Sequence, residues 1–528
     1  MPASRDQRAS RLATPQPRDQ PASTLTDQQA SKLSRKLADL VGSSHVLRDP
    51  ALRAPYEVDW TRRWRGEAAL VVRPASTAEL ASVVAVCAEE QAAIVVQGGN
   101  TGLVGGGVPV GGEVVVSTAR ISWVGEVDTA SGQISAGGGA ALAAVQDAAR
   151  ARGFEVGIDL ASRGSATLGG MVATNASGLS AVRFGRMASR MISLEAVLAS
   201  GAVISAVPGS HFGQGGYDLA SLLAGSEGTL GIVTGVTMQL VPKPSKLVTA
   251  LVGLDAGAVR TNGNDLGRAS PAVYRATSAA AAAISHLRNV LSSRLRAAEL
   301  LYPDAMAMVC ALHGSAPPFG TSHDAYLLIE CATDETGADA AGGKADLADD
   351  LASDLTEDLS AKLAGALSQC PSVGACAVAD DDSGRRRLWR YREGISEAIS
   401  RAGIPHKLDV HVPLSEAAGF VAEVHRIVHA MSPSSKVIIF GHIGVGNLHL
   451  NVIGPDPEDT AVDDAILEAV VAAGGDVSAE HGVGRAKAPW LPRVLSSEQL
   501  DAMWRLKSAL DPKGLLNPGV VLLPPQRL

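Results

Sequence analysis

Apolar residues in the first part of the chain fall in short continuous runs separated by turn signals. Such runs are typical of strands that are buried on both faces. Ser76, followed three residues later by Glu79, has the form of a capping box and predicts a helix over 77–90. A second helix is predicted over 29–41, at the entry to the fold. The strands predicted in this part are 70–72, 94–96, 114–116, 194–198 and 202–204.

The pattern changes after Pro242 and Pro244, which end the preceding apolar run and mark a domain boundary. Leucines spaced four apart predict a helix over 344–367, with its acid-rich faces in solvent. The Asp, Gly, Asn and Arg residues of 255–270 predict a loop. Further strands are predicted over 247–252, 326–329, 406–412 and around 448–452, and further helices over 388–401 and from about 497.

The N-terminal residues 1–30 are rich in Arg, Gln, Ser, Pro and Asp and have almost no apolar residues. A segment of this composition cannot bury enough surface to order itself, so we expect a disordered tail. Its recurring arginines also suggest an organelle transit peptide. Asp6 and Asp19 argue against that alternative, because transit peptides avoid acidic residues.

Bulk composition excludes some classes of function. The 528 residues carry a net charge of −8, so binding to nucleic acid or to an anionic membrane is not expected. Hydrophobic residues make up 46% and charged residues 19%, as in a soluble globular protein. No run approaches the roughly twenty apolar residues of a membrane helix. The five cysteines form no CxxC pair, which indicates mostly buried, reduced thiols and a reducing compartment.

Three glycine-rich segments stand out, and we call them the first (97–107), second (164–178) and third (225–234) glycine loops. The first has six glycines in eleven residues between two predicted strands, so many backbone N–H groups can face phosphate oxygens. No GxGxxG and no GxxxxGK[ST] occurs, which leaves a dinucleotide fingerprint or a P-loop unsupported. A flexible surface loop is the alternative. The three loops together favour an extended cofactor that lies across two subdomains.

Two segments near the C-terminus carry metal-binding side chains. His442 and His449 are followed about thirty residues later by the adjacent pair Glu480 and His481. Imidazole and carboxylate are ligands that zinc takes, with one position left open when the site is catalytic. On a strand, His449 and Asn451 point to the same face. The alternative is that two of the twelve histidines fall close together by chance in a buried strand.

A second constellation is basic. Arg392 and Ser396 lie four residues apart in the helix predicted over 388–401 and so share a face, and Lys407 follows on the next strand. A guanidinium, a hydroxyl and an ammonium together make a carboxylate clamp, our name for these three side chains. The alternative is that the arginine is solvated, as helix arginines usually are.

The motifs GGNTGL, GGMVATNASG and GSEGTLGIVT occur in this order, and together they resemble the FAD-binding domain of the vanillyl-alcohol oxidase (PCMH-type) flavoprotein superfamily. Within it the chain resembles the D-2-hydroxyglutarate dehydrogenase and D-lactate dehydrogenase family, over residues 35 to 522. The resemblance implies bound FAD, and the absence of a histidine in the first glycine loop implies that it is not covalently attached. The implied FAD-binding residues are Gly98, Gly99, Asn100, Thr101, Gly102, Leu103, Gly164, Thr167, Gly169, Gly170, Thr174, Asn175, Gly228, Ile232, Val233 and Asn517.

The same resemblance assigns roles to the other two constellations. It implies a divalent metal, with zinc as the first expectation, and a carboxylate clamp for the far end of a diacid. The family commonly has an aspartate where this chain has Val445, which points to weaker support of the metal or to a different substrate subgroup. The implied residues are His442, His449 and Glu480 for the metal, His481 as the base, and Arg392, Ser396, Lys407 and Asn451 for the substrate.

The resemblance also implies an α+β fold. Its parts are a two-subdomain PCMH-type FAD-binding domain, an antiparallel-sheet substrate (cap) domain and a C-terminal helical return segment. The expected division is a disordered tail (1–30), the FAD-binding domain (31–245), the substrate domain with the metal and catalytic residues (246–484), and the segment that packs back on the FAD domain (485–528).

The implied activity is oxidation of a D-2-hydroxy acid to the 2-oxo acid by hydride transfer to flavin N5, with D-2-hydroxyglutarate as the first expectation. D-lactate or another monoacid is the alternative substrate. A flavin-binding or electron-relay protein with an impaired metal site is a second alternative. The expected electron acceptor is an electron-transfer flavoprotein or a quinone, and a homodimer is a candidate assembly. The expected location is the cytoplasm, or the mitochondrial matrix if the tail is a transit peptide.

Overall fold

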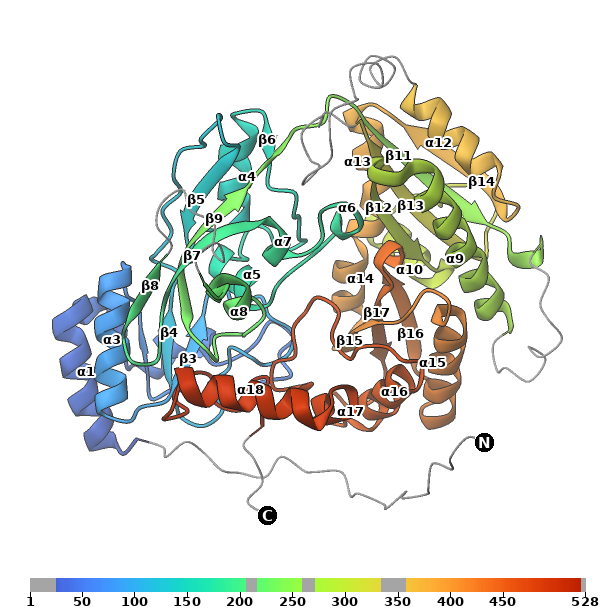
Figure 1. Ribbon diagram of the computed structural model, residues 1–528. Helices are drawn as coiled ribbons and strands as arrows, with labels where there is room; N and C mark the ends of the chain where they lie inside the picture. The colour runs from blue at the N-terminus through green and yellow to red at the C-terminus, as the bar shows by residue number, and fades with distance from the viewer. Residues whose placement is uncertain (1–24, 206–215, 259–270, 334–357, 524–528) are drawn as a thin grey trace, which may run out of the picture.

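The computed structural model describes residues 25–205, 216–258, 271–333 and 358–523. Most of the tail predicted over 1–30, and most of the loop over 255–270 and of the helix over 344–367, lie outside the described residues. Figure 1 shows two halves, one built on two four-stranded sheets and the other on a seven-stranded sheet, with helix α18 (Ser497–Leu510) lying beneath both.

The first sheet has the strand order β1-β2-β4-β3, with β2 and β3 both parallel to β4. The apolar runs that predicted these strands are buried, as expected for a sheet covered on both faces. The helix predicted over 29–41 begins at Asp27, capped by Thr26, so the predicted tail extends too far by these residues. The elements are α1 (Asp27–Val41), β1 (Val46–Leu47), β2 (Leu70–Val72), α3 (Thr77–Glu89), β3 (Ile94–Gln97) and β4 (Val114–Ser117).

The second sheet is antiparallel and has the order β5-β9-β7-β8. The second glycine loop contains α5, which packs against β9 and β5 of this sheet in a core that also includes residues of α4. The third glycine loop leads into β9, the long central strand. The elements are β5 (Gln133–Gly137), α4 (Leu142–Arg150), α5 (Leu168–Ala173), α6 (Ala181–Phe184), α7 (Met187–Arg190), β7 (Met191–Val197), β8 (Val203–Ser205), α8 (Leu219–Leu223) and β9 (Ile232–Gln239), beside the pair β6 (Phe154–Glu155) and β10 (Val241–Pro242).

The third sheet is fully antiparallel, in the order β14-β11-β13-β12-β16-β17-β15, as predicted for the second half. Alternate residues of one strand enter different cores. In β13, Leu327 and Ile329 pack toward α9, α12 and α15, whereas Tyr326 and Leu328 pack toward α10, α13 and α14. The strands are β11 (Leu247–Leu254), β12 (Leu295–Leu301), β13 (Ala325–Ala332), β14 (Val373–Ala379), β15 (His406–His411), β16 (Lys436–Gly441) and β17 (Asn447–Ile453).

Helices cover both faces of this sheet, and α9, α12 and α15 lie on the face turned away from the other half of the molecule (Figure 1). The residues predicted as a helix over 388–401 are helical except at Gly394, which divides them between α13 and α14. A Cβ at Gly394 would lie 2.9 Å from His313 Nε2 and 3.0 Å from Val309 Cγ1, so α10 packs against bare backbone there. The helices are α9 (Pro271–Leu291), α10 (Pro303–His313), α12 (Leu359–Ser368), α13 (Asp382–Glu393), α14 (Ile395–Ala402), α15 (Ala417–Met431), α16 (Ala461–Ala472) and α17 (Leu491–Val494).

The segment after α18 returns to the first sheet, as predicted for the end of the chain. Ile94 N donates to Leu515 O at 2.7 Å, and Asn517 N donates to Ile94 O at 2.8 Å, so the segment extends the sheet beside β3. This pairing places Asn517 next to the first and third glycine loops. Within the described residues, no helix is both long and apolar enough to cross a membrane.

Candidate active site

A cavity of about 460 Å³ brings together the three glycine loops, the predicted metal ligands and the carboxylate clamp. Its volume is in the range of about 300–1,000 Å³ that small-molecule and cofactor sites occupy. Its walls come from both halves of the molecule, so neither half forms the site alone. Of the predicted site residues, Gly164 and Asn175 are not among the described residues that line it, whereas all the others are.

The glycines of the first loop serve two different purposes. A Cβ on Gly98 would lie 2.2 Å from Thr167 Oγ1, and one on Gly99 would lie 1.8 Å from Ser165 O. These two positions therefore need glycine because the first and second loops touch there. A Cβ on Gly102 would meet no atom within 4 Å, so this glycine borders open cavity and leaves its backbone accessible to a cofactor.

The asparagines predicted to bind FAD brace the loops with their side chains. Asn100 Nδ2 donates to Val58 O at 2.9 Å, and Asn175 Oδ1 accepts from Ala188 N at 3.0 Å. Asn517 Oδ1 accepts from Val96 N at 2.8 Å, which ties the return segment to β3. All three asparagines have positive φ angles, between 43° and 50°, which asparagine tolerates better than most residues. Each therefore fixes a sharp turn at or beside the cavity.

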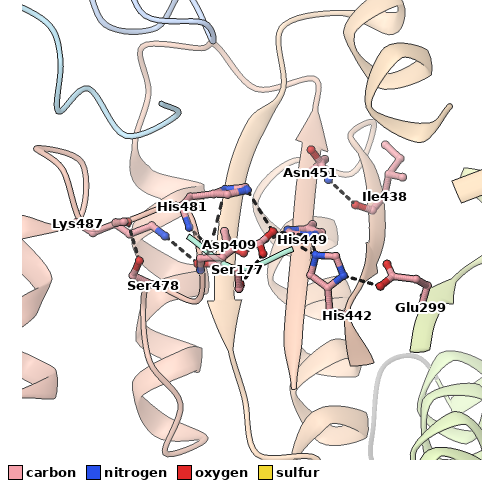
Figure 2. A network of polar contacts seen from close by, with 12 residues as sticks. Ser177, Glu299, Asp409, Ile438, His442, His449, Asn451, Ser478, His481 and Lys487 are labelled. Atoms are coloured by element: carbon pink, nitrogen blue, oxygen red, sulfur yellow. Dashed lines mark hydrogen bonds and ion pairs between the residues drawn. The ribbon is translucent and has the colours of Figure 1, made fainter. Parts of the chain in front are cut away.

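The three predicted metal ligands converge. His442 Nε2 lies 3.2 Å from Glu480 Oε1 and 3.4 Å from His449 Nε2, and the His449 Nε2 to Glu480 Oε1 distance is 3.5 Å. Bonds of about 2.0–2.1 Å to a tetrahedral zinc ion hold their ligand atoms about 3.3–3.4 Å apart. The triangle therefore has the size that a tetrahedral divalent metal requires. Figure 2 shows the two histidines side by side, His449 on β17 and His442 directly after the end of β16.

Two buried carboxylates stand behind the histidines. Glu299 Oε1 lies 2.5 Å from His442 Nδ1, and Asp409 Oδ1 lies 3.2 Å from His449 Nδ1 without hydrogen-bond alignment. Carboxylates on Nδ1 leave the Nε2 lone pairs facing one another, which is the tautomer that a metal needs. Ser177 from the second glycine loop donates to Glu480 Oε2 at 2.9 Å, so the flavin-loop half also orients a ligand.

The charges of this cluster favour a bound cation. Burial alone would lower the pKa of His442, but Glu299 and Glu480 raise it to about 10. Burial alone would raise the pKa of Glu480, but the imidazoles of His442 and His449 lower it to about 2. The carboxylates therefore stay ionised and hold a positive charge beside them, either a proton on His442 or a metal that takes the place of that proton. These observations show that the residues present fit a divalent metal.

His481 lies over His449, with ring centroids 5.3 Å apart and planes within 10°. Its Nε2 is 3.8 Å from Glu480 Oε1, and its Nδ1 is 3.9 Å from Asp409 Oδ2. Burial lowers the pKa of His481 to about 4, even though Asp409 opposes this shift. The imidazole is therefore neutral at physiological pH and can accept a proton beside the metal ligands.

An overlapping set of possible ligands includes Asp409 and His481. Together with His449 and Glu480, these residues each place one ligand atom within 4.8 Å of the others. However, Asp409 Oδ2 already accepts from the backbone N–H groups of Glu480 and His481, at 2.7 and 2.9 Å. The tighter triangle with His442 is therefore the better metal site, and Asp409 is the residue that holds the 480–481 turn in place.

The carboxylate clamp lines the same cavity even though the helix that predicted it is broken. Arg392 ends α13 and pairs through Nε with Glu299 Oε2 at 2.5 Å, while its guanidinium lies 4.6 Å from the Phe440 ring centre. Lys407 Nζ lies 4.7 Å from the ring centre of Trp60 and has no carboxylate partner among the described residues. Burial, helped by the charge of Arg392, lowers the pKa of Lys407 to about 8. Ser396, the third member of the carboxylate clamp, also lines the cavity.

Several functional side chains were not predicted from the sequence. Glu299 and Asp409 are each the single acid of their strand and have apolar residues on both sides, and such a buried acid needs a partner, which is the signal that could have identified them. Ser177 and Trp60 carry no such signal. Asn451, predicted to contact substrate, lines the cavity and donates to Ile438 O at 3.3 Å, and its buried Oδ1 has no partner among the described residues.

Family models match both halves of the chain. Residues 68–206 match the FAD binding domain, and residues 269–521 match the C-terminal domain of FAD linked oxidases. D-2-hydroxyglutarate dehydrogenase of Bos taurus, named as mitochondrial, is 34% identical over 94% of this chain and 84% of its own length. The chain belongs to the D-2-hydroxyglutarate dehydrogenase family. The family resemblance read from the three glycine loops is thereby confirmed.

Two more comparisons agree with this family. The D-2-hydroxyglutarate dehydrogenase of Xanthomonas citri pv. viticola is 32% identical over 92% of this chain and 95% of its own length. Among solved structures, 4-ethylphenol oxidase from Gulosibacter chungangensis has the same fold, with a TM-score of 0.70 over 96% of this chain and 99% of its own, at 18% identity. The expected α+β, PCMH-type fold is therefore confirmed, and the family is one of FAD-linked oxidoreductases.

Val445, the departure from the family motif, follows His442 closely in the chain, and its backbone N–H donates to His442 O at 3.0 Å. It ends the short turn Ile443–Val445 and is not among the described residues that line the cavity. Both histidines have a carboxylate behind Nδ1 without it, from Glu299 and Asp409. The ligand triangle is thus complete in this chain despite valine at this position.

Proposed function

We propose that this protein is an FAD-dependent, metal-assisted dehydrogenase that oxidises D-2-hydroxyglutarate to the 2-oxo acid. The observation that carries the proposal is the meeting, in one cavity, of the glycine loops, the His442–His449–Glu480 triangle and the ammonium of Lys407, which no carboxylate of the described residues pairs with. The first and second glycine loops lie within the residues that match the FAD binding domain, and the names of the relatives supply the substrate class.

When bound, FAD supplies a hydride acceptor, and a divalent metal, zinc first, supplies Lewis-acid polarisation of the substrate hydroxyl. His442, His449 and Glu480 would hold the metal. His481 Nε2 faces this triangle, so the neutral imidazole takes the proton of the C2 hydroxyl as general base, while the C2 hydrogen leaves with its electron pair. Asp409 lies on the Nδ1 side and stabilises the imidazolium that forms.

The carboxylate clamp explains why a diacid is favoured over a monoacid. Lys407 is half-buried and lacks a carboxylate partner among the described residues, although it faces the cavity. A cation in this position is more stable when a ligand brings a negative charge, because burial otherwise disfavours the ammonium. Arg392 and Ser396 add a fork and a hydroxyl, so a far carboxylate would orient C2 toward the flavin loops.

The proposal also includes the electron acceptor, the division into domains and the cellular location. The two-electron acceptor that regenerates oxidised flavin is an electron-transfer flavoprotein or a quinone. The division into an FAD-binding domain (31–245), a substrate domain (246–484) and a return segment (485–528) follows the three sheets and α18. Five free cysteines suit a reducing compartment, either the cytoplasm or the mitochondrial matrix.

Anaerobic addition of D-2-hydroxyglutarate to the oxidised yellow protein tests the proposal. We expect the visible flavin band to bleach, and bleaching to stop after metal removal and to return with Zn²⁺. A flavin that stays oxidised with every D-2-hydroxy acid offered would contradict the dehydrogenase function. Bleaching that survives complete metal removal would contradict the metal assistance alone.

Lys407→Met separates the diacid from the monoacid hypothesis. We expect KM for D-2-hydroxyglutarate to rise about tenfold or more, because a charge-assisted contact of about 1.5–3 kcal/mol is lost. KM for D-lactate should change little. Arg392 is a poorer choice for this experiment, because it also pairs with Glu299 behind the metal triangle. A similar rise in KM for both substrates would contradict the assignment of a diacid substrate.

A further inference from the structure

Glu299 connects two parts of the site that the proposed function treats as separate. The carboxylate lies on β12 and is fully buried. One oxygen, Oε2, accepts from Arg392 Nε at 2.5 Å, and the other, Oε1, lies 2.5 Å from His442 Nδ1. A single carboxylate is therefore the common partner of the clamp arginine and of a metal-ligand histidine, and Figure 2 shows it beside His442.

The contact with Arg392 limits what that arginine can do. Its Nε is committed to Glu299, and its guanidinium is held against the Phe440 ring at 4.6 Å. The terminal nitrogens, which take no part in this ion pair, are the ones that can reach a far carboxylate. A ligand carboxylate and Glu299 would then share one guanidinium, so each reduces the charge that the arginine offers to the other.

The contact between Glu299 and His442 transmits this change in the charge around Glu299 to the proposed metal ligand. A carboxylate that accepts from Nδ1–H makes the opposite nitrogen, Nε2, a stronger ligand. When a ligand carboxylate draws Arg392 away electrostatically, Glu299 becomes the stronger acceptor and His442 Nε2 the stronger donor to a metal. The ligand also adds a negative charge near the cation, which acts in the same direction.

We propose that Glu299 is a positioning residue that couples the far-carboxylate site at Arg392 to the metal at His442. This inference rests on the proposed function. A five-carbon diacid and the metal then strengthen each other's binding. The coupling is reciprocal by thermodynamic necessity, and such couplings are usually about five- to 150-fold. The metal site would thus favour diacids over monoacids of equal length, in addition to the direct contacts of the clamp.

The test measures Zn²⁺ affinity of the flavin-loaded protein by competition with a chromophoric chelator. Two unreactive acids are compared, glutarate and pentanoate, which share a chain length and one carboxylate that can reach the metal. We expect glutarate to tighten Zn²⁺ binding about tenfold more than pentanoate does, within the usual range of such couplings. In Glu299→Gln this difference should vanish, and Zn²⁺ affinity without any acid should fall about 10- to 100-fold.

Glu330→Gln is the matched control. Glu330 is also a buried carboxylate of the same sheet and pairs with Arg385, another arginine of α13, but it does not appear among the described residues that line the cavity. This variant should keep the difference between glutarate and pentanoate. A difference that disappears equally in both variants would overturn the proposal, because it would reflect a loosened helix.

A second variant keeps the test decisive if Glu299→Gln does not fold. Arg392→Gln leaves the carboxylate on His442, so Zn²⁺ affinity without acid should not fall, while the advantage of glutarate should vanish. A fall in that affinity, or an advantage that persists in either variant, would overturn the coupling. Failure of the wild-type protein to bind Zn²⁺ would instead overturn the proposed function, so the two failures are distinguishable.

Discussion

Burial sets the protonation state of His481, the proposed proton acceptor. His481 has no carboxylate in direct hydrogen-bond contact among the described residues, since Asp409 and Glu480 lie 3.9 and 3.8 Å away. Burial therefore dominates and holds its pKa at about 4, below the ordinary value for histidine. A neutral imidazole beside two anionic carboxylates is an unusual combination, and it is the state that a general base requires.

Replacing this base should stop chemistry without emptying the site. We expect His481→Asn to slow anaerobic flavin reduction about 10²- to 10⁴-fold, the usual contribution of a general base. FAD content and Zn²⁺ content should stay at the wild-type level, because His442, His449 and Glu480 are untouched. Stopped-flow bleaching gives the rate, and metal analysis gives the content. Reduction at the wild-type rate would exclude His481 as the base.

Lys407 should give substrate binding an alkaline limit. Its pKa is lowered to about 8, first by burial and then by Arg392, so the ammonium is charged below this pH and loses its charge as pH rises through it. The apparent KM for the diacid should therefore rise above pH about 8 and stay flat below it. The folded pKa lies below the ordinary 10.5, so stability from this group increases as pH rises between these two values.

The control for this limit is Lys407→Arg. A guanidinium stays charged in this range, so the alkaline rise in KM should disappear while binding at neutral pH is kept or modestly weakened. KM measured against pH for both proteins decides the matter. An alkaline rise that is unchanged in the variant would assign the titration to another group.

At the scale of the elements, different glycines of the first loop serve packing and cofactor binding. Gly99 needs to lack a side chain because its Cβ would lie 1.8 Å from Ser165 O, a backbone atom that cannot move aside cheaply. Gly102 has open space around the corresponding position. The two glycines of one loop should therefore respond in different ways to the same substitution.

We expect Gly99→Ala to lower the unfolding temperature of the FAD-free protein, with a loss of about 1–3 kcal/mol from overpacking. Gly102→Ala should leave that temperature unchanged within error and weaken FAD binding. Thermal unfolding of the FAD-free proteins and FAD titration by fluorescence measure the two effects. Equal destabilisation by both substitutions would contradict this division of roles.

At the scale of the whole molecule, α18 holds the return segment against the third glycine loop through one buried ammonium. Lys507 Nζ donates to Thr229 O and Leu516 O, both at 2.8 Å, and to Asp511 Oδ2 at 2.5 Å. The side chain is only 9% exposed, so the ion pair is shielded from water. This cluster joins the last helix to the cavity wall.

Lys507→Met should destabilise the protein by about 3 kcal/mol, at the low end for a broken buried ion pair. The low end applies because Asp511 keeps its bonds from the backbone N–H groups of Leu515 and Leu516. Lys513→Met is the control, since that exposed lysine donates to Ala88 O and has no carboxylate partner among the described residues. Its substitution should change stability by less than about 0.5 kcal/mol. Denaturant unfolding of both variants provides the comparison.

Metal removal should also act on the whole molecule. The triangle joins β16 and β17 to the 480–481 turn, which Ser177 links to the second glycine loop. A metal at one hundred times its Kd stabilises the folded state by about 2.7 kcal/mol. Chelation should therefore lower the unfolding temperature, and Zn²⁺ should restore it, while FAD stays bound. An unfolding temperature that is indifferent to the metal would contradict a site that bridges the two halves.

The sequence could predict elements wherever a local pattern decided them. Buried β-branched runs identified β2, β3 and β4, and the capping box identified α3 to within one residue. It could not predict the break at Gly394, because that break depends on the close approach of α10. Nor could it assign the glycines of the first loop, because the atoms that exclude a side chain there belong to the second loop.

By itself, the sequence determined the family, the three glycine loops and the residue types of the proposed metal site, since these lie in contiguous motifs. Only the tertiary structure decided which side chains hold those motifs in place. Glu299 is 143 residues from His442, and Ser177 is 303 residues from Glu480. The physical reason is that a buried charge takes its partner from whatever the fold places beside it. The number of residues between two partners along the chain does not reveal that the fold brings them together.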